Sequence, residues 1–312
     1  MAEVKSYLRD EAPPAPADNA VTYARVELGK RLFFDPRLSG SGRISCATCH
    51  NPALGWSDGL PTAIGHGMKQ LERHTPTILN SAYHRRQMWD GRFASLEEQA
   101  LGPIGSADEM NMDVAEMVKR LKSIDGYRTL FDLAYPGEGI TDKTVAKAIA
   151  SFERTIVSRP SPFDHWLSGE RNAVSPAAKR GFELFRGKAN CVACHDGANF
   201  SDDGFHNIGV RQHPGVDDPG RFASVAVKAM KGAHKTPSLR DVAYTAPYMH
   251  NGAYSTLRQV VEMYSRGGDV GDNLDPNIRK LDLTASEIED IVAFLESLSG
   301  DPVLVAAPQL PY

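Results

Sequence analysis

The 312-residue chain lacks an excess of charge of either sign, since 35 basic residues stand against 39 acidic ones, for a net charge of −4. We therefore expect no nucleic acid as a partner. No apolar run approaches the ~20 residues that a membrane-spanning helix needs, so no membrane span is expected. The alternation of apolar and polar residues that is typical of β-strands is also missing. Hydrophobic residues still make up 41% of the chain, which indicates a globular protein.

Cysteine is scarce, and the four cysteines fall into two copies of one pattern. The copies are Cys46-Ala-Thr-Cys49-His50 and Cys191-Val-Ala-Cys194-His195, with no cysteine left over. Cys-x-x-Cys-His is the attachment pattern of c-type haem, in which both thiols bind the porphyrin and the histidine ligates the iron. A redox disulfide or a zinc site of four thiolates needs no histidine after both pairs. The sequence therefore predicts two covalently bound c-type haems, with His50 and His195 as iron ligands.

The start of the chain lacks the apolar core of a signal peptide. An Ala/Pro-rich stretch at residues 12–17 indicates a flexible lead-in. Haem of this type is attached outside the cytoplasm in bacteria. We therefore expect a periplasmic protein whose signal peptide has been removed from this chain.

The chain contains an internal repeat. Residues 75–99 and 236–260 align without a gap at an offset of 161, with identical residues at seven places. The two haem motifs are only 145 residues apart, so the second half holds about sixteen additional residues between its motif and its repeat block. A repeat of this kind predicts two domains that share one fold.

Helical signals stand on both sides of the haem motifs. Residues 143–157 and 175–186 have helical character, and Thr284 begins a capping box before an apolar periodicity of helical spacing. The predicted fold class is mainly α, with two cytochrome c-like domains that each carry one covalently bound c-type haem. We place the N-terminal domain at 20–160 and the C-terminal domain at 165–300.

Met263 and Tyr264 stand side by side, and both residue types can ligate haem iron. The offset of 161 places Gly102 opposite Met263 and Pro103 opposite Tyr264. Proline offers no side-chain ligand. If this position faces the iron in both halves, Tyr264 caps one iron and the other is open. An iron ligated on both sides passes electrons, whereas an open iron can bind a small molecule and react.

The chain resembles the bacterial di-haem cytochrome c peroxidases and the MauG-type enzymes related to them. The resemblance extends from Gly29 to about Leu298 and rests on the two haem motifs, TPTILN, WDGR, LEEQALGPI and TAPYMHNG, in this order. It implies that the first haem is the peroxide site and that the second receives electrons. It also implies that Tyr264, fourteen residues after His250, is the distal ligand of the second iron. Ordinary peroxidases have methionine there and MauG has tyrosine.

The resemblance also assigns the pocket at the first iron. It implies that Glu109 moves a proton between the peroxide oxygens and that Gln99 orients the peroxide, at the iron that the repeat leaves open through Pro103. Trp89 would carry electrons between the two haems. Without the resemblance, Glu109 could equally be a solvated acid and Trp89 a core residue.

Two further ligand predictions stay open. His66 stands sixteen residues after His50, where ordinary peroxidases have a histidine that caps the first iron at rest, although MauG-type enzymes leave this iron open. A surface-loop histidine is the alternative. The resemblance also implies Ca²⁺ between the domains, bound by the carbonyls of Thr245 and Pro247 and by asparagine at position 74. Here His74, a poor ligand for a hard cation, weakens that prediction.

The sequence is compatible with three functions. The first is a peroxidase that reduces hydrogen peroxide to water with electrons from a small cytochrome c or copper protein. The second is a MauG-like enzyme that oxidises residues of a partner protein after storing two equivalents over both irons as a bis-Fe(IV) state. Residues 187–190 lack the tryptophan that MauG has before its second motif. The third, a non-enzymatic electron-transfer cytochrome, conflicts with Pro103 at the ligand position. The resemblance leaves a homodimer open.

Overall fold

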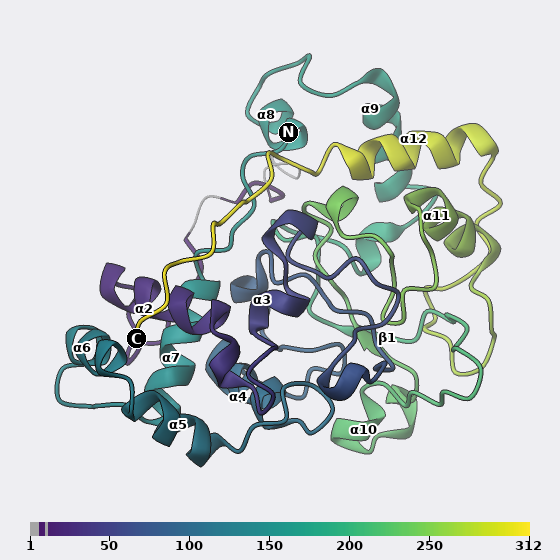
Figure 1. The fold of residues 1–312 in the computed structure, drawn as a ribbon. Helices are drawn as coiled ribbons and strands as arrows, with labels where there is room; N and C mark the ends of the chain where they lie inside the picture. The colour runs from purple at the N-terminus through teal and green to yellow at the C-terminus, as the bar shows by residue number, and fades with distance from the viewer. Residues whose placement is uncertain (1–5, 10–11) are drawn as a thin grey trace.

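A computed structural model describes residues 6–9 and 12–312 of the chain (Figure 1). The fold is mainly helical, as the sequence predicts, with long loops between the helices. In the described part of the first half the α-helices are α2 (Tyr23–Phe34), α3 (Cys46–Cys49), α4 (Leu96–Gly105), α5 (Val114–Lys122), α6 (Asp125–Ala134) and α7 (Asp142–Glu153). Those of the second half are α8 (Pro162–Leu167), α9 (Pro176–Arg186), α10 (Phe222–Val225), α11 (Leu257–Arg266) and α12 (Ala285–Glu296). The only strands in the described chain are β1 (Phe205–His206) and β2 (His234–Lys235), which pair antiparallel.

Each half is built around one tightly packed helix pair. In the first half α2 packs on α7, and in the second half α9 packs on α12. Both contacts depend on a glycine. A Cβ atom on Gly29 would lie 1.8 Å from the carbonyl oxygen of Ala148, and a Cβ atom on Gly181 would lie 1.8 Å from that of Asp290. The backbones therefore approach too closely for any other residue at these two positions.

Replacing Gly181 with alanine is expected to destabilise the fold by roughly 1–3 kcal/mol or more, because the added methyl group must push the backbone of α12 away. Gly105→Ala is the matched control. Its Cβ would lie 4.0 Å from the nearest side-chain atom, an ordinary contact. Denaturant unfolding of both variants measures the difference. Equal midpoints for the two variants would show that the α9–α12 contact does not require glycine.

The repeat found in the sequence is also present in the backbone. Helices α4 and α11 begin and end at positions that differ by 161 residues. Met88 and Met249, two non-glycine residues with positive φ of 73° and 74°, are also 161 residues apart. Position 103 of α4 and position 264 of α11 are therefore structurally equivalent.

Two hydrophobic cores occupy the two halves, one over residues 28–156 and one mainly over residues 163–298. Each end of the described chain contacts the core of the opposite half. Tyr7 packs in the second core, whereas the C-terminal segment runs from α12 down to α2 and α6, where Val303 packs on the first core (Figure 1). The division at about residues 160–165 stays a prediction. No helix of the described chain has the length and apolarity needed to cross a membrane.

Candidate active site

A single large cavity extends through both halves of the molecule. Its volume is about 1270 Å³, which exceeds the ~300–1,000 Å³ of a usual single-ligand pocket. Its lining includes all four cysteines and the histidine that follows each pair: Cys46, Cys49, His50, Cys191, Cys194 and His195. The two sequence motifs are therefore brought to one continuous space.

The two motif histidines are held in matching orientations. Nδ1 of His50 lies 3.1 Å from the carbonyl oxygen of Trp56, and Nδ1 of His195 lies 2.9 Å from that of Phe200. Because a carbonyl only accepts, each Nδ1 carries the proton, and each Nε2 keeps a free lone pair for a metal. Burial lowers the pKa of both imidazoles, which favours the neutral form that binds iron.

The residues that line the cavity fit haem as a cofactor. All four cysteines are free thiols, and each pair lies beside its histidine along the cavity wall. The buried lysine Lys235 also lines the cavity, and burial lowers the pKa of its amino group to about 8. The described structure records only a long 3.4 Å contact from this amino group, to the carbonyl oxygen of Thr236. A porphyrin carboxylate would supply the missing partner.

The distal side of the first half is polar. Helix α4 places Gln99 and Pro103 one turn apart on the same face, and both line the cavity. Glu109, four residues beyond the end of α4, lines the same cavity. Gln99 and Glu109, which the resemblance assigns to the peroxide pocket, therefore line the same cavity as Pro103, the residue that the repeat places opposite Tyr264 and that presents no side-chain ligand.

The three equivalent positions of the second half hold two valines and one tyrosine. At the offset of 161 within the two helices, Val260 corresponds to Gln99 and Tyr264 corresponds to Pro103. Beyond the ends of the helices, the same offset makes Val270 correspond to Glu109. All three line the cavity. At these three positions the second half offers a phenol that can ligate a metal and has no counterpart of the Glu109 carboxylate.

Tyr264, rather than Met263, faces the cavity. Met263 is fully buried in the described protein and does not line the cavity, whereas Tyr264 does. Burial raises the pKa of the Tyr264 phenol. The protein alone therefore keeps this phenol neutral, and the positive charge of a bound ferric iron is what would stabilise its anion.

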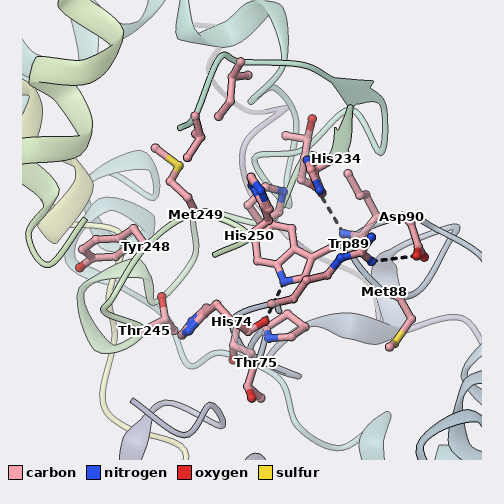
Figure 2. A pocket seen from close by; sticks show the side chains of 18 of the residues that line it. His74, Thr75, Met88, Trp89, Asp90, His234, Thr245, Tyr248, Met249 and His250 are labelled. Atoms are coloured by element: carbon pink, nitrogen blue, oxygen red, sulfur yellow. Dashed lines mark hydrogen bonds and ion pairs between the residues drawn. The ribbon is translucent and has the colours of Figure 1, made fainter. Parts of the chain in front are cut away.

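Trp89 and His250, which occupy equivalent positions in the two repeats, meet where the halves join. Their ring centroids are 6.5 Å apart in an edge-to-face arrangement (Figure 2). The indole N–H donates to the carbonyl oxygen of His74 at 2.9 Å, and the backbone N–H of Lys235 donates to the carbonyl oxygen of Trp89 at 2.8 Å. Trp89 is therefore fixed between the halves by contacts to both of them.

A charged cluster lies beside Trp89, and no sequence pattern predicts it. Arg73 binds Asp218 through two hydrogen bonds of 2.7 Å, and Nε2 of His234 lies 3.3 Å from the Asp218 carboxylate. His234 in turn stacks on His250, with ring centroids 3.7 Å apart. Arg73 and Asp218 are 145 residues apart, so no local pattern could have linked them. Through Asp218, the cluster links the segment between the second haem motif and the second repeat block to Arg73 of the first half.

His66 does not line the cavity in this structure, although its neighbour Gly65 does. The backbone N–H of His66 donates to the carbonyl oxygen of Asp108, and the buried Nδ1 of its ring has no hydrogen-bond partner among the described residues. The role of His66 as a resting ligand of the first iron stays a prediction.

The residues at the predicted calcium site do not fit a hard cation. Thr245 and Pro247 line the cavity, as does His74. Nδ1 of His74 lies 2.7 Å from the carbonyl oxygen of Leu60, so this nitrogen is the donor of the ring. Ca²⁺ needs about six to eight oxygen ligands, and an imidazole does not replace the missing amide oxygen.

Comparisons with known proteins agree with this geometry. A family model described as di-haem cytochrome c peroxidase matches residues 23–172, and a cytochrome c model matches residues 178–299. The chain is 48% identical over 306 residues to the methylamine utilization protein MauG of Methylorubrum extorquens, covering 98% of this chain and 86% of that protein.

Two further proteins are also similar to this chain. Cytochrome c551 peroxidase of Nitrosomonas europaea is 39% identical over 290 residues, which cover 92% of this chain and 83% of the relative. A crystal structure of a MauG-like protein associated with microbial copper homeostasis superposes with a TM-score of 0.86 and 34% identity, covering 95% of this chain and 94% of the other.

Proposed function

Because this chain belongs to the di-haem cytochrome c peroxidase family, we propose that it reduces hydrogen peroxide to water in its first half and exchanges electrons or oxidising equivalents through its second half. The observation that carries this assignment is the asymmetry of the two distal sides. Gln99, Pro103 and Glu109 line one side, whereas valines and Tyr264 line the other. Only the first side combines an open ligand position with a group that can move protons.

A haem held by Cys46, Cys49 and His50 would supply an iron at which peroxide binds and its O–O bond is cleaved. The protein's own part is proton transfer and positioning. The carboxylate of Glu109 takes the proton from one peroxide oxygen and returns it to the other, which leaves as water. The Gln99 amide offers both a donor and an acceptor to orient the bound peroxide.

Trp89 supports electron exchange between the two sites. It lies against His250 of the second half, and its indole is fixed by the hydrogen bond to the His74 carbonyl. Tyr264 would ligate the iron held by Cys191, Cys194 and His195. An anionic oxygen ligand favours the ferric and higher oxidation states, so the second site is better suited to share oxidising equivalents than to store an electron of low energy.

Tyr264 also favours a second candidate function, the oxidation of side chains of a partner protein. The 48% identity to a methylamine utilization protein MauG supports this alternative. Assays of peroxide consumption with a reduced c-type cytochrome separate the two functions. Oxidation of two equivalents of the cytochrome per peroxide supports the peroxidase, whereas peroxide consumption that leaves the cytochrome reduced favours a protein substrate.

We further propose a periplasmic location, since two covalently attached haems require assembly outside the cytoplasm. The small electron-donor protein would be a cytochrome c or a copper protein. A homodimer stays a prediction.

Replacing both Cys191 and Cys194 with alanine is expected to halve the covalently bound haem, because only the pair Cys46 and Cys49 then remains. The pyridine haemochrome absorbance per mole of protein, together with the mass of the denatured chain, measures this number. The reciprocal double variant at Cys46 and Cys49 should give the same value. A wild-type protein that carries one haem, or none after denaturation, would contradict the assignment.

A further inference from the structure

Glu153, the last residue of α7, is a buried carboxyl group that the mechanism above does not use. Its side chain lies at the wall of the cavity and the residue is only 4% exposed. Its Oε2 atom has no hydrogen-bond partner in the part of the chain that the structure describes. A buried and unpaired carboxylate is costly, so its presence at a haem-sized cavity requires an explanation.

The second half provides an internal comparison. Gly29 contacts Ala148 and Phe152 as Gly181 contacts Asp290 and Phe294, so α7 and α12 correspond at an offset of 142 residues. At this offset, Ile149 corresponds to Ile291, and both line the cavity. Glu153 corresponds to Leu295, which also lines the cavity. The same place in the fold therefore holds leucine in one half and a carboxyl group in the other, so the packing itself does not demand a carboxyl group.

The neighbouring cation does not neutralise Glu153. Arg154 donates to Glu97 of α4 at 2.8 and 3.1 Å and to the carbonyl oxygen of Pro14 at 3.1 Å. The charged and titratable groups that act on Glu153 are Arg154 on its own helix, Glu97 on α4, and the Cys46 thiol, which a haem would convert to a thioether. Burial raises the pKa of Glu153 to about 8, ahead of the opposing effect of Arg154.

We propose that Glu153 is the proton-holding group of the first haem site, which binds a proton from solvent when the site gains an electron and releases it when the electron leaves. This rests on the proposed function, in which the first half carries the peroxide haem. The electron comes from the donor protein. The proton converts the Glu153 carboxylate to the neutral acid, so the charge inside the cavity is unchanged by the combined step.

The physical reason is the low dielectric of the cavity wall. An added electron raises the energy of a nearby carboxylate and thereby raises its affinity for a proton, and loss of the electron reverses this. Because the reduced site binds the proton more tightly, its reduction potential falls as the pH rises through the range around the pKa of Glu153. Leu295 cannot titrate, so the second haem lacks this source of pH dependence.

The test is a spectroelectrochemical titration of the holoenzyme from about pH 6 to about pH 10. In the wild-type protein the potential of the first haem is expected to fall toward the limit of about 59 mV per pH unit for one proton per electron. Glu153→Gln keeps the shape of the side chain and should lose this slope. Glu153→Leu, which copies the second half, should lose it as well. Glu296→Gln, on the exposed face of α12, is the matched control and should retain it.

Redox-difference infrared spectra provide a second readout that does not depend on turnover. A carboxylic-acid carbonyl band that follows the redox state of the first haem should be present in the wild type and absent from Glu153→Gln. Equal slopes in wild type and Glu153→Gln, or an unchanged infrared band, would overturn the proposal. Failure of the proposed function alone would give a different result. The pH slope of the first haem's potential would still depend on Glu153, but peroxide would react with Glu109→Gln at the wild-type rate.

Discussion

Replacing Glu109 with glutamine is expected to slow the reaction of the oxidised protein with hydrogen peroxide by about a hundredfold to ten-thousandfold, the usual contribution of a general acid–base group. Glutamine keeps the size and the hydrogen-bonding capacity of the side chain but cannot accept the peroxide proton. Stopped-flow absorbance at the haem Soret band, under pseudo-first-order peroxide, measures the rate.

The reaction rate should respond to Glu109 and not to acidic residues in general. Glu116→Gln, which removes an exposed carboxylate on α5, is the control and is expected to react at the wild-type rate. The haem content and the spectrum of Glu109→Gln should match the wild type, because Glu109 binds neither thiol nor iron. An unchanged rate in Glu109→Gln would remove this residue from the mechanism.

Replacing Tyr264 with methionine is expected to raise the reduction potential of the second haem by on the order of 100 mV or more, since axial ligands set haem potentials over a span of about 0.8 V. A thioether favours ferrous iron, whereas a phenolate oxygen favours ferric iron. Spectroelectrochemical titration of the variant measures the shift. The variant should also keep its second haem reduced under conditions in which the wild type is oxidised.

Met263 supplies the matched control for this experiment. Met263→Leu conserves volume in a fully buried site that does not line the cavity, so the potential of the second haem should stay at the wild-type value. A shift in Met263→Leu with none in Tyr264→Met would mean that the methionine is the ligand. The geometry of α11 and the resemblance would then both have pointed to the wrong residue.

The mainly helical fold and the repeat could be predicted because their signals are local. The capping box at Thr284 begins α12 where the sequence predicted it, and the predicted helix over 175–186 is α9. The gapless offset of 161 is reproduced by α4 and α11, which is why a count along the chain could place Pro103 opposite Tyr264.

Other features could not be predicted because they depend on contacts between distant segments. The ion pair of Arg73 with Asp218 joins the two halves, and no periodicity reports it. Glu153 lies in a helix that was predicted, but helical spacing alone does not show that its carboxyl group is buried without a partner. The contact of each chain end with the core of the opposite half, such as that of Tyr7 with the second core, has no signal in either segment.

We propose that the first half presents an open haem site and shares its oxidising equivalents with a tyrosine-ligated second haem. One equivalent of hydrogen peroxide added to the fully ferric protein, without any reductant, tests it most directly by electron paramagnetic resonance. We predict that the ferric signals of both haems decrease together, because His66 does not line the cavity and Tyr264 favours higher oxidation states of the second iron. Signals that stay unchanged until one electron is supplied would contradict the account, since a side chain such as His66 must then cap the first iron at rest.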